Sequence, residues 1–542
     1  MLTAPHQTTG VRRLLVVLSV ASFFFFQIAY GQTDVTTYHF DNARDGLNPN
    51  EIILTPANVN ASTFGKLGLY QLDGKVDAQP LYLSQVPIAN VMHNVLYAVT
   101  EHDSVYALDA DTGTVLWQKS MLKSGEGTSD NHGCNQISPE IGITATPVIK
   151  RTGPGFGSIF VVAMSKDAAG AYHQRLHALS LTSGDEMEQG PTEITASYPG
   201  TGQFSANGMQ LFDPAKYAER VGLLLLNDSI FMGWTSHCDQ DPYTGWLMMY
   251  DARTLRPRSV LNLTPNGEVE PHYEGGEGSI WMAGSGLAGD NQGNVYFLDA
   301  NGIFDTTLDS RGFPNHGDFG NAFMKVSSVR GRLIPADYFS TFDTLQKSLA
   351  DEDLGSGGVL LLPDVTDSNG TTRHLAVGAG KDGNIYLVDR DNMGKFNASS
   401  NNIYQQLSHV LSGVYGMPAY FNGTVYYGSI NSTLQAFALQ SGQLGITPSS
   451  QTAISFTYPG TTPGISANGT QNGIVWAIEN TSPAVLHAYD ATNLANELYN
   501  SNQAANARDQ FGNGNKFITP TIVNGKVFVG TPNGVAVFGL LQ

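Results

Sequence analysis

Short turns that follow apolar segments along this 542-residue chain carry charged and imidazole side chains at matching positions. The side chains of these turns that could bind a ligand or take part in a reaction are His102, Asp103, Lys166, His237, Asp239, Lys381 and Asp382. If these turns lie on the same face of the protein and surround one pocket, their cations and carboxylates together would suit a polar ligand, and especially an anionic one. The alternative is that these are ordinary hairpin turns, which favour Asp, Asn and Gly. That alternative does not account for the two histidines or the two matching lysines.

A second set of candidates stands where chain segments approach the first strand of a repeat. Glu140 and Glu277 are carboxylates that could hold a calcium ion if further oxygen ligands joined them. The alternative role for each is to cap exposed backbone amides. Trp281 follows Glu277 closely and offers a flat face for stacking a ligand.

The elements that position these residues are recurring four-strand units. Residues 95–117, VLYAVTEHDSVYALDADTGTVLW, contain an apolar strand, a polar turn, a second strand, a tight turn and a short strand ending in Trp117. Such a unit cannot bury both of its faces alone. Its recurrence every 40 to 60 residues or so therefore predicts blades stacked around an axis.

About eight copies can be aligned between residue 78 and the C-terminus, and the last copy has no fourth strand. Residues 64–71, FGKLGLYQ, alternate like an outer strand and belong to no complete unit. Pairing them with the last copy would close the ring and remove an exposed edge. We therefore predict an all-β fold, an eight-bladed β-propeller of four-stranded antiparallel blades closed by an N-terminal strand. In the fourth copy we place the first strand at residues 279–284, and short helices are expected at residues 214–220 and 342–350.

Composition and the N-terminus limit the class of protein. Lys and Arg number 28 against 47 Asp and Glu, a net charge of −19. Without a basic stripe, a nucleic-acid partner is not expected. Residues 1–31 have the pattern of a signal peptide, since Arg12 and Arg13 precede an apolar run at 14–26 and a small-x-small site at 29–31. We expect residues 32–62 to form an extension and residues 63–542 a single propeller domain.

The signal segment predicts an exported protein, periplasmic or secreted, without a membrane span after cleavage; an uncleaved anchor is the alternative. Cys134 and Cys238 are the two cysteines of the chain. In an oxidising compartment they form either a disulfide or two buried thiols. The repeat register places both on the same face in adjacent blades, so we expect the disulfide.

The turn of the first repeat also carries a family resemblance. Ala107, Asp109, Thr112, Gly113 and Trp117 have the spacing of the tryptophan-docking repeat of quinoprotein propellers. The chain resembles the pyrroloquinoline quinone (PQQ) repeat superfamily over nearly the whole segment after the signal. The resemblance implies an eight-bladed propeller, with PQQ and Ca²⁺ as cofactors if the chain is a dehydrogenase, and otherwise none. Family dehydrogenases commonly carry a disulfide between neighbouring cysteines, and some a C-x-x-C-H haem motif; this chain has neither.

Three functions remain open at this point. The first is a binding or scaffold protein that uses a polar funnel on one face for a small-molecule, glycan or protein ligand, as the resemblance to propellers that support outer-membrane protein assembly implies. The second is a PQQ- and calcium-dependent dehydrogenase acting on an alcohol or sugar. The third is a polysaccharide-active enzyme. The chain has no Gly-x-Ser-x-Gly elbow, P-loop or His-Glu-x-x-His helix for other chemistries.

Overall fold

A computed structural model describes residues 1–4, 33–187, 190–203, 205–267 and 276–541. Most of the predicted signal segment, residues 1–31, lies outside the described residues. Residues Thr33–Gln542 form one compact unit, which takes in both the expected extension and the expected propeller domain. No helix in the described ranges is long and apolar enough to cross a membrane.

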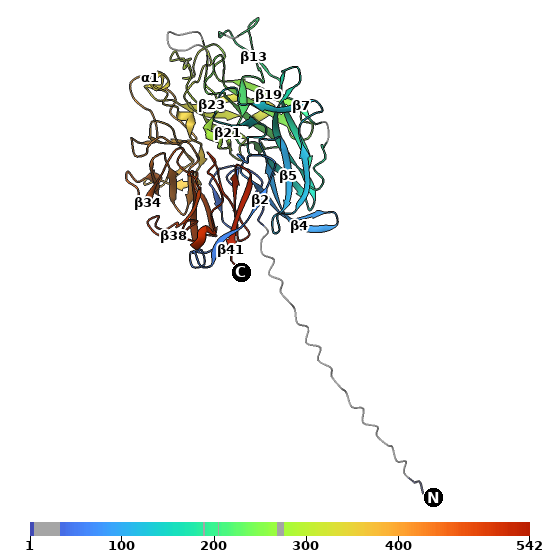
Figure 1. Ribbon diagram of the computed structural model, residues 1–542. Helices are drawn as coiled ribbons and strands as arrows, with labels where there is room; N and C mark the ends of the chain where they lie inside the picture. The colour runs from blue at the N-terminus through green and yellow to red at the C-terminus, as the bar shows by residue number, and fades with distance from the viewer. Residues whose placement is uncertain (5–32, 188–189, 204, 268–275, 542) are drawn as a thin grey trace. The chain divides into compact units, whose positions relative to one another are not determined.

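The first four blades are antiparallel sheets that follow one another along the chain (Figure 1). Blade one contains β3 (Leu81–Ile88), β4 (Val91–Val99), β5 (Ser104–Asp109) and β6 (Val115–Ser120). Blade two contains β9 (Val148–Gly153), β10 (Phe156–Asp167), β11 (Tyr172–Ser180) and β12 (Thr192–Glu193), with β7 (Glu126–Asp130) and β8 (Glu140–Ile141) added. Blade three contains β15 (Tyr217–Glu219), β16 (Leu224–Leu226), β17 (Ser229–Ser236), β18 (Trp246–Asp251) and β19 (Pro257–Asn262). Blade four contains β20 (Ala288–Gly289), β21 (Asn294–Leu298), β22 (Phe323–Ser327) and β23 (Ile334–Phe339).

The other four blades repeat this arrangement. Blade five contains β24 (Leu360–Leu361), β27 (Leu375–Ala379), β28 (Ile385–Asp389) and β29 (Gln405–Leu407). Blade six contains β30 (Ala419–Phe421), β31 (Thr424–Gly428), β32 (Ser432–Gln440), β33 (Gln443–Leu444) and β34 (Ser450–Phe456). Blade seven contains β35 (Gly464–Asn468), β36 (Gln471–Glu479), β37 (Val485–Asp490) and β38 (Glu497–Asn500). Blade eight contains β39 (Thr521–Val523), β40 (Lys526–Thr531), β41 (Gly534–Leu540) and β2 (Phe64–Gln71).

The ring closes as the sequence predicts. Strand β2 pairs antiparallel with β41 from Phe64↔Leu540 to Gln71↔Gly534, with one irregularity in register near Lys66. Phe64 is fully buried, and its ring lies 5.4 Å from that of Trp476 in blade seven. The N-terminal strand therefore completes the last blade and joins it to its neighbour. The eight-bladed all-β fold is confirmed.

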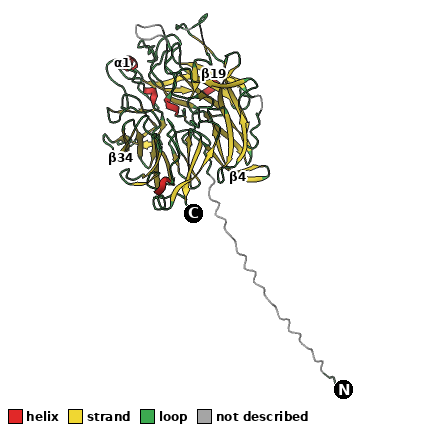
Figure 2. Ribbon diagram, viewed as in Figure 1, coloured by secondary structure: helices red, strands yellow, loops and turns green. Residues whose placement is uncertain are grey.

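Elements outside the blades are short (Figure 2). They are the hairpins β13 (Ser197–Pro199) with β14 (Met209–Leu211) and β25 (Val365–Thr366) with β26 (Thr372–Arg373), helix α1 (Thr344–Leu349), and the 3-10 turns η1 (Met282–Gly284), η2 (Val329–Gly331), η3 (Leu354–Ser356) and η4 (Ala505–Ala507). The helix expected at 342–350 is confirmed as α1. The helix expected at 214–220 is wrong, because this segment pairs with β17 as strand β15. The strand expected at 279–284 is also wrong: it contains η1, and β20 is the first strand of blade four.

The repeat motif of blade one shows how a turn fixes a blade. Asp109 Oδ1 accepts hydrogen bonds from the amides of Asp111 and Thr112 and from the Thr112 hydroxyl. Gly113 follows with φ +77°, which glycine adopts without strain. The turn directs Trp117 toward blade two, where its Nε1 donates to the carbonyl of Leu181 at 3.1 Å. Local turn chemistry thus sets the contact between neighbouring blades.

A segment that we call the belt, residues 35–51, runs along the first strands of the blades in order. It begins beside blade one, where Val35 and Tyr82 exchange two backbone hydrogen bonds. Further hydrogen bonds join the belt to blades two to eight in order. They are Thr36 O with Ile149 N, Asn42 Nδ2 with Leu225 O, Asn42 O with Gly289 N, Ala43 O with Leu361 N, Asp45 O with Tyr420 N, Gly46 O with Ile465 N, and Asn48 Nδ2 with Ile522 O. Strand β1 (Leu47–Asn48) pairs parallel with β35 as part of this belt.

Arg44, near the middle of the belt, links the belt to the blades through hydrogen bonds. Its guanidinium is fully buried and donates five hydrogen bonds, to the carbonyls of Leu287, Tyr38, Asp41 and Leu223 and to the Thr37 hydroxyl. These acceptors belong to the belt itself and to blades three and four. One side chain therefore ties the belt to the ring.

Candidate functional site

A cavity of about 290 Å³ is formed where turns and loops of several blades meet. Its walls include the β17–β18 turn of blade three, the β27–β28 turn of blade five, and the loops that carry Tyr415 and Tyr458. The size is near the lower end of small-molecule sites, which span roughly 300–1,000 Å³. The sequence-based candidates that line it are His237, Asp239, Trp281 and Lys381, together with both cysteines.

Aromatic side chains make one wall of the cavity. The Trp281 ring meets the rings of Tyr415 and Phe517 edge to face, with centroids 5.9 and 6.5 Å apart. Tyr458 contacts both Tyr415 and Phe517 in the same manner. Edge-to-face contacts hold each ring by its neighbours. The wall can therefore present a fixed apolar surface to a ligand.

Lys381 places a positive charge beside this wall. Its Nζ lies 5.6 Å from the centre of the Trp281 ring and forms ion pairs with Asp351 at 2.5 Å and Asp353 at 2.6 Å. Burial opposes the charged form, but the two carboxylates raise the pKa of Lys381 above its usual value. Burial raises the pKa of Asp353 to about 6, although Lys381 acts in the other direction. The site thus holds a lysine cation and a carboxyl group that titrates nearer to neutrality.

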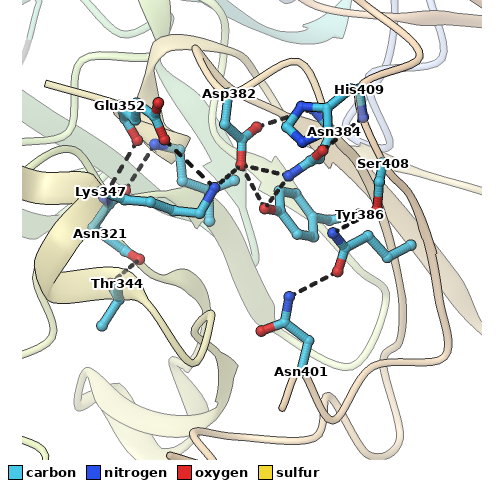
Figure 3. A network of polar contacts seen from close by, with 12 residues as sticks. Asn321, Thr344, Lys347, Glu352, Asp382, Asn384, Tyr386, Asn401, Ser408 and His409 are labelled. Atoms are coloured by element: carbon cyan, nitrogen blue, oxygen red, sulfur yellow. Dashed lines mark hydrogen bonds and ion pairs between the residues drawn. The ribbon is translucent and has the colours of Figure 1, made fainter. Parts of the chain in front are cut away.

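The polar network of Figure 3 holds helix α1, and Asp351 and Asp353 follow this helix in the chain. Lys347 on α1 forms a 2.5 Å ion pair with Asp382, which also accepts hydrogen bonds from Tyr386 and Asn384 (Figure 3). This contact fixes α1 against blade five, and the residues after α1 turn toward Lys381. Asp382 is therefore held in a supporting network and is not among the residues that line the cavity.

The predicted disulfide is present in the structure. Cys134 and Cys238 are bonded, with their Cα atoms 5.7 Å apart, and both line the cavity. The imidazole of His237 stacks on that of His132 with ring centres 4.0 Å apart. Burial, with a contribution from His132, lowers the pKa of His237 to about 3. His237 is therefore neutral at physiological pH, and its buried Nε2 has no hydrogen-bond partner among the described residues.

Asp239 and Glu277 are two further carboxyl groups predicted from the sequence. Asp239 accepts hydrogen bonds from the hydroxyls of Ser236 and Tyr243, each at 3.0 Å. Burial, together with the nearby charges of Asp241 and Asp239, raises the pKa of Glu277 to about 8. Glu277 is therefore protonated over much of the neutral range and can act as a hydrogen-bond donor.

Other candidates from the sequence lie outside the cavity lining. His102 Nδ1 lies 3.1 Å from Glu140 Oε1, and Glu140 also accepts a hydrogen bond from Thr128. Asp103 is fully buried, and burial raises its pKa well above the usual value. Lys166 forms an ion pair with Asp130 at 2.6 Å. The structure thus separates these residues from His237, Asp239, Trp281 and Lys381.

Sequence reasoning missed Arg220, which lines the cavity and is 4% exposed. It follows β15, in the segment that was expected to be helical. Its Cζ lies 4.5 Å from the centre of the Phe517 ring. The Arg220 Nε has no hydrogen-bond partner, and none of the ion pairs formed by described residues includes this guanidinium. Tyr415, Tyr458, Asp351 and Asp353 were also missed, because they lie in long loops without a repeating pattern.

The donor set fits an organic cofactor better than a metal. The flat face of Trp281 suits a planar organic ring such as that of PQQ, while the ammonium of Lys381 beside it is already paired with Asp351 and Asp353. Glu140 and Glu277 have no partner in common, and no three His, Cys, Asp or Glu side chains in the described ranges are grouped as metal ligands. We therefore derive no step that depends on calcium.

Solved structures with a similar fold include several dehydrogenases. The quinohemoprotein alcohol dehydrogenase of Comamonas testosteroni matches with a TM-score of 0.59 and 14% identity, over 94% of this chain and 80% of that one. A quinohemoprotein alcohol dehydrogenase of Pseudomonas putida HK5 gives the same values. A europium-containing methanol dehydrogenase matches with a TM-score of 0.57 and 12% identity, over 94% and 98% of the two chains. No family model and no curated protein matches the chain. At these identities the likeness establishes the fold.

Proposed function

We propose that this chain is an exported binding propeller of the PQQ-repeat type, and that its cavity holds a small polar molecule with a ring. The observation that carries the proposal is the aromatic wall of Trp281, Tyr415 and Tyr458 with the Lys381 ammonium beside it. Apolar walls with a few fixed polar groups are typical of small-molecule sites. The disulfide at the cavity supports export, since such bonds persist in oxidising compartments.

A dehydrogenase that uses PQQ is the second candidate. Asp353 favours it, because this carboxyl group has a pKa of about 6, lies 2.6 Å from Lys381 and lines the same cavity as Trp281. When bound, PQQ would supply the electron-accepting chemistry. The chain's own contribution would be Trp281 against the quinone ring, Lys381 as a cation beside it, and Asp353 accepting a proton from a substrate hydroxyl.

One titration tests both candidates. The purified chain lacking residues 1–31 is mixed with PQQ, with and without Ca²⁺, and absorbance, melting temperature and dye reduction with alcohols and sugars are recorded. Binding without turnover supports the first candidate, and dye reduction that Asp353→Asn abolishes supports the second. Trp281→Ala should weaken binding by at least tenfold, whereas Trp117→Ala, which alters an interblade contact away from the cavity, serves as the control. Failure of PQQ and a panel of ring-bearing polar molecules to bind would contradict both.

A further inference from the structure

Arg220 is a buried cation that forms no direct ion pair among the described residues. Its side chain reaches the cavity, yet its Nε has no acceptor and its guanidinium belongs to none of the ion pairs found in the described part of the chain. A guanidinium carries five N–H donors and stays charged in proteins. Buried charges are normally paired, because taking an unpaired charge out of water carries a large desolvation penalty. Arg220 therefore departs from what a purely structural arginine needs.

The surroundings of Arg220 do not supply the missing partner. The carboxyl groups that act on it electrostatically are Asp77 and Glu101, which favour its charged form. Asp77 is already paired with Lys75 at 2.9 Å, and Glu101 accepts hydrogen bonds from Gly142 N and Thr144 Oγ1. Burial lowers the pKa of Arg220 in spite of both groups. The remaining contact is the face of Phe517, which accommodates a cation but accepts no conventional hydrogen bond.

A second cation adds to the positive charge on this side. Lys516 Nζ donates to the Gln136 side chain at 3.2 Å and to the carbonyl of Asn135 at 3.4 Å, and both acceptors are neutral. Burial and the charges of Arg220 and Lys75 lower the pKa of Lys516. The carboxylates of Asp351 and Asp353 form their ion pairs with Lys381 and not with Arg220 or Lys516. Asp77 lines one small cavity with Arg220 and Lys516 and favours the charged form of both, but its direct ion pair is with Lys75, so neither of these two cations has a carboxylate of its own.

We propose that Arg220 is the anchor for an oxyanion, a carboxylate, phosphate or sulfate carried by the ring-bearing ligand of this cavity. The inference rests on the proposed binding function and adds the chemical class of the ligand. An oxyanion would accept two parallel N–H bonds from the guanidinium, and its charge would replace the missing partner. The ring of the same ligand would lie against the wall formed by Trp281, Tyr415 and Tyr458.

The test measures ligand-free stability first. Arg220→Met removes an unpaired buried charge and keeps an apolar side chain of similar length, so we expect the melting temperature of the ligand-free protein to stay the same or rise. Arg44→Met, which removes a fully bonded guanidinium, should lower it. A fall with Arg220→Met similar to that with Arg44→Met would show that Arg220 is structural and would overturn the inference.

The second measurement uses benzene-1,3,5-tricarboxylate, inorganic phosphate and phenyl phosphate, with benzene-1,3,5-tricarboxamide as the neutral match. We expect the anions to raise the melting temperature and to bind by calorimetry, at least tenfold more weakly in Arg220→Met and partly restored in Arg220→Lys. The carboxylate and phosphate probes show which of these two oxyanions the site prefers. If the triamide bound as tightly as the tricarboxylate, the proposed binding function would stand, but the assignment of Arg220 as an anion anchor would be overturned. If none of these probes bound, both the binding function and the anion assignment would be overturned.

Discussion

Replacing Arg44 by methionine tests whether the belt holds the eight blades together. The substitution keeps an apolar stem of similar length but removes all five hydrogen bonds of the guanidinium. Four of the acceptors are backbone carbonyls, of Leu287, Tyr38, Asp41 and Leu223, and they would lose these bonds. Because Arg44 is fully buried, water cannot replace the lost donors without opening the belt.

The magnitude follows from these contacts. A hydrogen bond to a charged group contributes about 1.5–3 kcal/mol, but removing the guanidinium also removes the free-energy penalty of burying its charge. We therefore expect a net loss of about 3–5 kcal/mol, typical of a broken buried network. An unfolding entropy of roughly 2.1 cal/mol/K per residue over about 500 residues equals about 1 kcal/mol per degree. The melting temperature should accordingly fall by about 3–5 °C.

Differential scanning calorimetry of the chain lacking residues 1–31 measures this fall. Arg311→Met is the matched control, since the Arg311 side chain is 77% exposed and its ion pair with Asp309 should contribute less than about 1 kcal/mol. Limited proteolysis should cut the belt faster in Arg44→Met than in the control. Equal melting temperatures for the two variants would refute the idea that the belt depends on Arg44.

Three further predictions concern the ring, the disulfide and the site. Phe64→Ala should cost about 3–5 kcal/mol because this ring packs on Trp476, Tyr499 and Phe538, whereas Leu67→Ala on the same strand, 47% exposed, should change little in a melting experiment. Thiol labelling of denatured, unreduced protein should find no free thiol, and replacing both cysteines by serine should cost up to about 4–5 kcal/mol, given the 104-residue separation. The free energy of unfolding should fall as the pH rises from about 4.5 to about 8, because folded Glu277 keeps a proton that the unfolded chain has released; a decline of the same size in Glu277→Gln would contradict this assignment.

The fold could be predicted because its signals are local and repeated. The turn around Asp109 and Gly113 bonds within itself, and Trp117 docks on the neighbouring blade, so a short sequence pattern reports a whole blade. The missing fourth strand of the last copy pointed to β2 by elimination. The belt could not be predicted in this way, because residues 35–51 have no period and bond chiefly to backbone atoms of strands distant in sequence.

The candidate site was predictable only in part, for a related reason. The position of a turn in its blade indicates the face on which its side chains lie, and it identified His237 and Lys381 as neighbours of one cavity. Whether a side chain reaches that cavity depends on partners from elements outside the repeated pattern, such as Asp130 on β7 for Lys166 and Lys347 on α1 for Asp382. Arg220 follows a short strand with no motif, and it stands out only because its buried Nε has no hydrogen-bond partner.

Two arginines of the described chain show how contacts separate structural from ligand-binding roles. Arg44 and Arg220 are both nearly or fully buried, and each is a large energetic liability if left unpaired. Arg44 donates to five acceptors supplied by the fold itself, while Nε of Arg220 has none and its guanidinium covers Phe517. Tyr38 of the belt, Arg220 and Asp77 line one small cavity of about 10 Å³, which is too small for a ligand, and Asp77 is paired there with Lys75. Arg220 also lines the larger cavity of about 290 Å³, which has room for a small ligand, and an anion bound there would supply the direct partner that the described residues do not give it.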